Sequence, residues 1–487
     1  MLTVKDRISD RLASFYNSKL YWFACIFISG IGIIFGIGIE AATLLILLMS
    51  GQFFVIRNCA RMFYPITFLS LTLMNFMGDD IRMGAILVVG VIPVLWGMFY
   101  NIKKYNKKFR INSAIPSMLF VSLAITLGGS FSISFREYFA IGNLFYIAFL
   151  GFGMVALCIL VFTLLDRENI EVLRYEFVHA VCDSGIFLGG VMIYYYLLNL
   201  SEFLKTQQIV EMLANNPFRN VAVGYYLLTM PFAFFCARRK FRYMIGGVTI
   251  YVACLVSGSR MGLLFGSLQF VVCMLYFIVT NKRRRRIFAV VLAVLLLIVF
   301  VMKDELLYFY LARTESGFIN PDEVRIKMMK RALSDFLSAP LFGQGIGYSG
   351  NIDLYYPGTF EMHWYHNFVC QIVGSLGLFG IVAYAYQFYS RLKLMLYRPT
   401  SFSWLIFLMY IGALMSGITD TGIFTPFPTV FLLNCAFMLV GISDRARQAG
   451  MQSPHRPTLM VKDPRKDAFS KMNKIVMSVL RRSKYTK

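Results

Sequence analysis

The sequence predicts an all-α, polytopic membrane protein with about fourteen transmembrane helices, and at least about twelve. Three observations support this fold class. Hydrophobic residues make up 58% of the 487-residue chain. They are grouped in successive stretches of roughly 17 to 25 residues, the length that a helix needs to cross a bilayer. The connections between the stretches alternate between strongly and weakly basic, which is typical of a chain that crosses a membrane repeatedly.

Each apolar stretch is expected to form one helix. In order along the chain, the stretches are 20–38, 41–56, 62–77, 84–101, 112–134, 139–163, 177–200, 220–237, 243–258, 261–280, 287–302, 365–388, 401–418 and 425–442. The first follows a charged N-terminal segment, and no small-residue cleavage site comes after it. We therefore expect a retained span there and not a signal peptide.

The placement of Lys and Arg predicts the orientation of the chain. The strongly basic connections are 103–110, 238–242, 282–286 and 391–398. With two weaker segments, 57–61 and 166–174, and both termini, they hold 37 of the 48 Lys and Arg residues. The positive-inside rule puts these segments and both termini in the cytoplasm. The net charge of +23 thus follows from topology, and no nucleic-acid partner is expected.

The nine cysteines indicate neither a zinc site nor a disulfide framework. All of them fall in or beside apolar stretches, and none is paired at CxxC spacing. We expect them to be small, lipophilic packing residues.

The chain is expected to divide into a transmembrane domain, residues 1–442, and a basic cytoplasmic tail, residues 443–487. The tail holds 12 Lys and Arg residues and has apolar positions at helical spacing near its end. A basic amphipathic helix on anionic lipid is the favoured interpretation, and a regulatory partner site is the alternative. One extracytoplasmic connection is long, residues 303–364, and we expect part of the active site there.

A helix is predicted within this long loop, between Asn320 as N-cap and Pro340 as terminator. Its apolar residues share one face, so the helix is expected to lie against the bundle or in the membrane interface. These residues are Ile326, Met329, Leu333, Phe336 and Leu337. On a helical wheel Arg325 borders the apolar face and Lys330 lies to its side, whereas Lys327 and Arg331 point away. Arg325 is therefore the cation expected to point towards the membrane domain.

Polar residues on the extracytoplasmic side form the candidate site. The short connection SGSR leaves Arg260 at the outer mouth of the bundle, where an unpaired charge is costly and a functional role is expected. The stretch PLFGQGIGYSG contains Gly345 and Gly347, whose backbone permits tight turns and close approach to a ligand. This stretch follows a helix and not a strand, which argues against a dinucleotide-binding loop.

Two of the four histidines, His363 and His366, lie within the stretch EMHWYHNFVCQIVGSLGLFG at the start of an apolar span. A histidine is the side chain best suited to take a proton from a hydroxyl group near neutral pH. Two guanidinium groups near such a base would hold an anion bidentately and stabilise a departing pyrophosphate without a metal.

The same stretch resembles a known family. His366-Asn367, nine residues, and then Gly377-Leu378-Phe379-Gly380 are similar to the His-Asn, spacer, Gly-x-x-Gly signature of the O-antigen ligase and polymerase superfamily. Upstream, SGSR, Arg325 ahead of a helix, and APLFGQGIG resemble the same family in order and approximate spacing. The resemblance covers residues from about Tyr243 to Phe388.

The resemblance implies an inverting membrane glycosyltransferase that uses no metal and no cofactor. Such enzymes move a glycan from a polyprenyl pyrophosphate to an acceptor sugar hydroxyl at the outer face of the bacterial cytoplasmic (inner) membrane. It implies that His366 activates the acceptor, that Arg260 and Arg325 hold the pyrophosphate, and that Asn367 supports the histidine. Further substrate contacts are expected from residues around these positions: His363, Tyr365, Lys330, Gly345 and Gly347.

The expected partners are the lipid-linked oligosaccharide donor, the glycan acceptor and membrane lipid, with a chain-length regulator and a flippase as further candidates. We favour a polymerase that joins repeat units of a surface polysaccharide (O-antigen, capsule or exopolysaccharide). A ligase that moves finished glycan to lipid A core or another acceptor stays open, as does a lipid-linked oligosaccharide flippase. A glycosyltransferase with an acidic base in Gly78–Asp80 is a further alternative, but no DxD motif or Walker loop accompanies it.

Overall fold

The computed structural model describes residues 4–74, 80–108, 112–128, 147–166, 168–198, 219–257, 259–281, 285–301, 303–304, 321–346, 364–397, 399–420 and 422–448. These residues form helices and connections without any strand. Every apolar stretch predicted from the sequence overlaps a helix, so the all-α fold class is confirmed.

The helices follow the apolar stretches closely. They are α1 (Val4–Tyr16), α2 (Lys19–Phe35), α3 (Gly38–Val55), α4 (Phe63–Met74), α5 (Asp80–Lys104), α6 (Ile115–Leu127), α9 (Phe152–Leu164), α10 (Ile170–Leu198), α13 (Arg219–Ala237), α14 (Arg242–Val256), α15 (Ser267–Thr280), α16 (Arg285–Val301), α18 (Pro321–Ser338), α19 (Phe368–Leu396), α20 (Ser401–Thr419) and α21 (Phe431–Gln448). Short 3-10 and π turns add η1 (Ala60–Met62), η2 (Gly262–Gly266), η4 (Gly422–Phe424) and η5 (Pro426–Val430).

The lengths and composition of these helices are those of a multi-pass membrane protein. Within the described part of the chain, 6 helices are long and apolar enough to cross a bilayer, or up to 7 if α1 and α2, which meet at 66°, count as one bent span. Shorter apolar helices, among them α6, α9 and α14, add to the bundle. The count of about fourteen spans stays a prediction.

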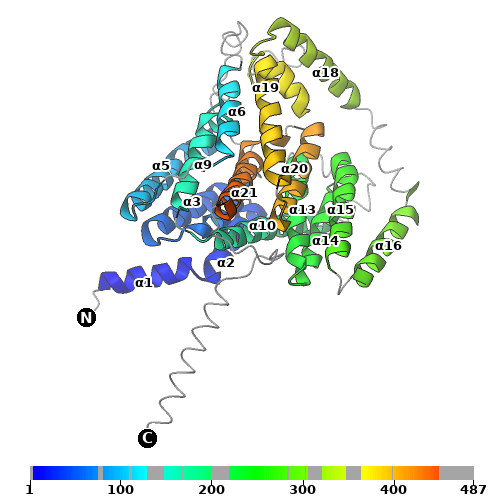
Figure 1. Ribbon diagram of the computed structural model, residues 1–487. Helices are drawn as coiled ribbons and strands as arrows, with labels where there is room; N and C mark the ends of the chain where they lie inside the picture. The colour runs from blue at the N-terminus through cyan, green and yellow to red at the C-terminus, as the bar shows by residue number, and fades with distance from the viewer. Residues whose placement is uncertain are drawn as a thin grey trace.

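The helix α13 lies at the centre of the bundle. It packs on α10, α14, α15 and α20 and is the most buried of the candidate spans. In Figure 1, α18 lies beside the start of α19, and α1 lies at the opposite end of the bundle. All nine cysteines are free and all but Cys370 are buried, which agrees with the predicted packing role.

Close backbone approach sets the register between α13 and α20. A Cβ on Gly224 would lie 2.6 Å from the hydroxyl oxygen of Ser416, and a Cβ on Gly412 would lie 2.3 Å from the carbonyl oxygen of Leu227. The two helices are therefore antiparallel. Continuing this register by one turn brings the beginning of α13 opposite the end of α20.

Two sequence expectations need correction. The helix α18 does not turn its apolar face to the bundle, because Ile326, Met329 and Leu333 are exposed. It packs on α19, and its buried Asp335 accepts a hydrogen bond from Tyr365, just before α19 begins. The membrane interface stays the predicted environment of the apolar face. Arg391, expected in a basic cytoplasmic connection, lies within α19 and is only 5% exposed, because its guanidinium bonds to Asn434 on α21.

Candidate active site

The start of α19 is fixed by Asn367. This residue has extended backbone angles and acts as N-cap: its Oδ1 accepts hydrogen bonds from the amides of Val369, at 2.9 Å, and Cys370, at 3.1 Å. Its Nδ2 donates to the carbonyl of Ile418 near the end of α20, at 2.9 Å. Asn367 thus joins the beginning of one helix to the end of another, and its side-chain amide is occupied by these bonds.

His366 precedes the cap in a left-handed backbone conformation, with φ 50°. Its imidazole is 45% exposed, and its Nδ1 lies 3.1 Å from Oδ1 of Asp420, the residue that ends α20. A carboxylate only accepts hydrogen bonds, so Nδ1 is the donor, and in the neutral ring the proton acceptor is then Nε2. The resulting histidine and aspartate pair leaves Nε2 as a proton acceptor on an accessible ring.

Asp420 was missed in the sequence. It follows an apolar stretch by two positions and belongs to no recognised motif. The signal that could have found it is an acidic residue at the end of the stretch 401–418, on the same predicted side of the membrane as His366.

Tyr365, predicted to contact substrate, is buried, with 1% of its surface exposed. Its hydroxyl donates to Oδ2 of Asp335 on α18 at 2.6 Å, and its amide donates to Oε1 of Gln371 at 3.1 Å. Asp335 is 2% exposed and forms an ion pair with Arg331 at 2.9 Å. Burial raises the pKa of this carboxyl, and the bonds from Tyr365 and Arg331 lower it in part. Tyr365, the residue directly before His366, is therefore bonded to α18.

The glycine-containing segment after α18, residues 340–345, packs against the glycine-containing segment of α19, residues 374–379. The amides of Gln344 and Gly345 donate to the carbonyls of Gly374 and Ser375, both at 2.9 Å. A further pair of bonds runs in the other direction, from Leu378 and Phe379 to the carbonyls of Pro340, at 2.8 Å, and Leu341, at 3.0 Å. The carbonyls of α19 are available because the helix is broken at Gly377, which has φ 62° and ψ −157°.

These contacts explain why glycines are needed here. A Cβ on Gly343 would lie 2.3 Å from the backbone of Ser375, and a Cβ on Gly377 would lie 2.7 Å from the amide of Gly343. Both residues also have positive φ, a conformation that side chains disfavour. The close approach predicted for Gly345 is therefore an approach to α19. Its amide already bonds to Ser375, so this group is not available to a ligand.

Arg260 lies at the same end of the bundle as the histidine and aspartate pair. The neighbouring Ser259 donates to Oδ1 of Asn220, at the start of α13, at 3.0 Å. The register between α13 and α20 brings this part of α13 opposite Asp420. The structure thus brings Arg260, His366 and Asp420, from three separate segments, to one end of the bundle.

Of the other predicted site residues, only Lys330 has a described side chain. Lys330 is exposed on α18. Arg325 belongs to the first turns of α18, but its side chain lies outside the described part, as do His363 and Gly347 entirely. Their roles stay predictions.

One region of the chain matches a known protein family. A family model described as O-antigen ligase matches residues 245–385. The matched segment contains Arg260, Arg325 and His366, together with both glycine stretches, and ends before Asp420. The predicted resemblance to the O-antigen ligase and polymerase superfamily is thereby confirmed. No curated protein matches the chain.

Proposed function

We propose that this membrane protein is an inverting, metal-independent glycosyltransferase that moves a glycan from polyprenyl pyrophosphate to an acceptor sugar hydroxyl. We place the reaction at the extracytoplasmic face of a bacterial cytoplasmic membrane, with both chain termini in the cytoplasm. The observation that carries the proposal is the exposed His366 bonded to Asp420, at the end of the bundle that also holds Arg260.

In the proposed reaction His366 is the general base. Its Nε2 takes the proton of the acceptor hydroxyl as the hydroxyl oxygen attacks the anomeric carbon of the donor sugar. The bond from that carbon to the pyrophosphate oxygen breaks, and its electron pair leaves with the polyprenyl pyrophosphate. Attack from the face opposite the leaving group inverts the anomeric configuration. Asp420 stabilises the imidazolium that forms, and its hydrogen bond to Nδ1 selects the tautomer of the neutral ring in which Nε2 is the proton acceptor.

Arg260 and Arg325 are proposed to bind the pyrophosphate. Guanidinium groups stay charged and match phosphate oxygens bidentately, so two of them stabilise the charge that develops on the leaving group. Replacing Arg325 by Ala is expected to abolish transfer. Arg331→Ala is the matched control on the same helix. A mild effect on transfer is expected, because Arg331 pairs with Asp335 and is not proposed to bind the pyrophosphate. Equal losses in the two variants would contradict the assignment.

Tyr365 is proposed to position the base and not to contact substrate. Its ring packs over Gly374, where a Cβ would lie 2.9 Å from the ring, and its hydroxyl bonds to Asp335. The adjacent His366 is therefore held in its left-handed conformation from the side of α18, while Asn367 holds it from the side of α20.

The favoured biological reaction is polymerisation of lipid-linked repeat units into a surface polysaccharide. The second candidate is ligation of finished glycan to lipid A core or another acceptor, and the family match fits both reactions. Both reactions use the same donor chemistry. We propose the lipid-linked donor, the glycan acceptor and membrane lipid as partners, with a chain-length regulator and a flippase as further partners.

The test is to replace His366 by Ala in the native host and to separate surface glycans by length. Glycans that carry a single repeat unit would indicate a polymerase. Loss of capped glycan with lipid-linked polymer retained would indicate a ligase. Unchanged glycan would refute the catalytic assignment, and lipid-linked units accumulating on the cytoplasmic leaflet would indicate flipping instead. His363→Ala is the matched control and is expected to weaken transfer without abolishing it.

A further inference from the structure

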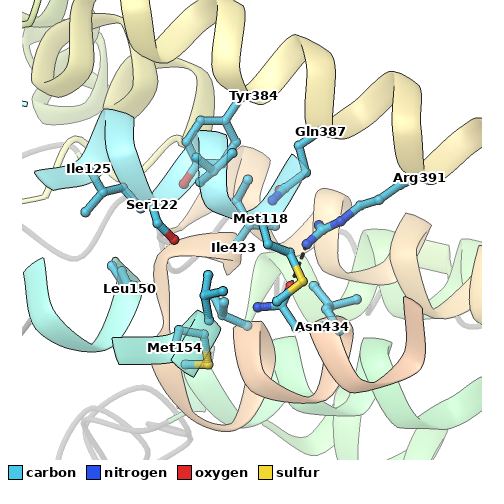
Figure 2. Close-up of a pocket in the computed structure, with 14 residues that line it drawn as sticks. Met118, Ser122, Ile125, Leu150, Met154, Tyr384, Gln387, Arg391, Ile423 and Asn434 are labelled. Carbon is cyan, nitrogen blue, oxygen red and sulfur yellow. Dashed lines mark hydrogen bonds between the residues drawn. The ribbon is translucent and has the colours of Figure 1, made fainter. Parts of the chain in front are cut away.

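A small polar cavity lies inside the bundle, away from the residues proposed for transfer. It is formed by α6, α9, α19, α21 and the segment of η4 and η5, and has a volume of about 30 Å³. Figure 2 shows the polar ends of Ser122, Tyr384, Gln387, Arg391 and Asn434 turned towards this space, among otherwise apolar walls.

The charge in this cavity is Arg391. The side chain is 5% exposed, and one of its nitrogens, Nη2, donates to Oδ1 of Asn434 at 2.9 Å. Its guanidinium carbon lies 5.2 Å from the ring centre of Tyr410 and 4.7 Å from that of Phe437. Within the described part of the chain no carboxylate forms an ion pair with it. A buried cation without a counter-charge is costly, because one amide and two ring faces replace only part of its hydration.

The groups around Arg391 also have unused hydrogen-bonding capacity. Ser122, Tyr384 and Gln387 line the cavity, and none of the three side chains forms a hydrogen bond to another described residue. Buried polar groups in proteins are nearly always hydrogen-bonded to protein, water or ligand. Two hydroxyl groups, two amides and a guanidinium therefore direct several N–H and O–H donors at one small space that carries a net positive charge.

We propose that this cavity binds a small monovalent inorganic anion, with chloride as the natural candidate. An anion would supply both what Arg391 lacks, a counter-charge, and what the surrounding donors lack, an acceptor. The volume limits the ligand: one water needs roughly 10–15 Å³, so a cavity of about 30 Å³ holds two or three waters or one small ion. A phosphate group, with four oxygens around its phosphorus atom, is larger and is expected to fit poorly.

The location gives the anion a structural consequence. Arg391 belongs to α19, Asn434 to α21, and Ser122 to α6, so one ion would join three helices that are distant in sequence. Ile423 and Val430, from the segment that follows Asp420, form part of the cavity wall. The anion site is thus independent of the proposed transfer chemistry, although it supports the segment next to it.

Thermal unfolding of the purified full-length protein in lipid nanodiscs tests the proposal. Sodium chloride is titrated against sodium gluconate at constant ionic strength. The apparent Tm of the unaltered protein is expected to rise with the logarithm of chloride concentration above the dissociation constant. Bromide should act like chloride, whereas phosphate should not. A Tm that is independent of the anion would overturn the proposal and leave a cavity filled by water.

Variants identify the site. Arg391→Met keeps the length of the side chain but removes its charge, and is expected to abolish the dependence on chloride. Lys393→Met, two residues away and exposed, removes the same charge from the same helix turn and should retain the full dependence. If Arg391→Met does not fold, Gln387→Leu and Ser122→Ala, which leave the charge in place, should shift the chloride titration to higher concentration. Unchanged titrations in both would contradict the assignment to this cavity.

Discussion

The substitution Asp420→Asn tests whether this carboxylate assists the proposed base, His366. The substitution keeps the shape of the side chain but removes the charge that stabilises the imidazolium form of His366. A hydrogen bond to a charged group is worth about 1.5–3 kcal/mol. Because the imidazole is 45% exposed and the carboxylate 17% exposed, water screens part of this energy. We therefore take about 1.4–2 kcal/mol, which corresponds to a roughly 10- to 30-fold lower kcat.

The assay is the initial rate of glycan transfer by purified protein in nanodiscs, with polyprenyl-pyrophosphate-linked repeat units as donor. The KM for the donor should change little, because Asp420 is not proposed to bind the pyrophosphate. Asp10→Asn, an exposed substitution on α1 at the other end of the bundle, serves as the control and should leave the rate unchanged. Full activity in Asp420→Asn, or a loss that only follows a lower Tm, would refute the role assigned to the carboxylate.

Three further predictions concern the contact between α18 and α19. Tyr365→Phe removes the 2.6 Å bond to Asp335, which should lower the free energy of unfolding by about 1–3 kcal/mol, as measured by unfolding curves. In transfer assays the same variant should have a lower kcat and a nearly unchanged KM. Because burial raises the pKa of Asp335 above 3.8, the folded state binds this proton more tightly than the unfolded state, so stability should fall as pH rises from about 4 through the raised pKa. Asp335→Asn should remove that fall in a pH series of unfolding curves. Gly343→Ala places a Cβ 2.3 Å from the backbone of Ser375 and should abolish folding or activity, whereas Gly190→Ala, with open space around it, should be tolerated.

The fold class could be predicted because its signals are local. A run of apolar residues long enough to cross a bilayer forms a helix whatever its neighbours are, so each predicted stretch overlaps a helix. The orientation of α18 could not be predicted in the same way. Its apolar positions dominate the helical wheel, but its buried Asp335 bonds to Tyr365, thirty positions away and just before α19. No local pattern reveals this contact.

Long-range contacts also limited the prediction of polar residues. His366 and Asn367 were found because they belong to one short motif, whereas Asp420 is 54 positions away and meets His366 only through the packing of α19 on α20. Arg391 was assigned to a basic connection because it begins a run with other basic residues. Its burial depends on Asn434, 43 positions away, and on two aromatic rings that no local pattern reveals.

The spacing within the His-Asn, Gly-x-x-Gly signature has a mechanical reason in this structure. Gly374 makes room for the ring of Tyr365, which lies beside the base, and Gly377 breaks α19 where the segment that follows α18 forms its backbone bonds. Both contacts fix α18, which carries the proposed pyrophosphate ligand Arg325, relative to His366. The glycines and the histidine thus serve the same geometric need. The base can act on the acceptor only if the residues that hold the donor lie at a fixed distance from the base.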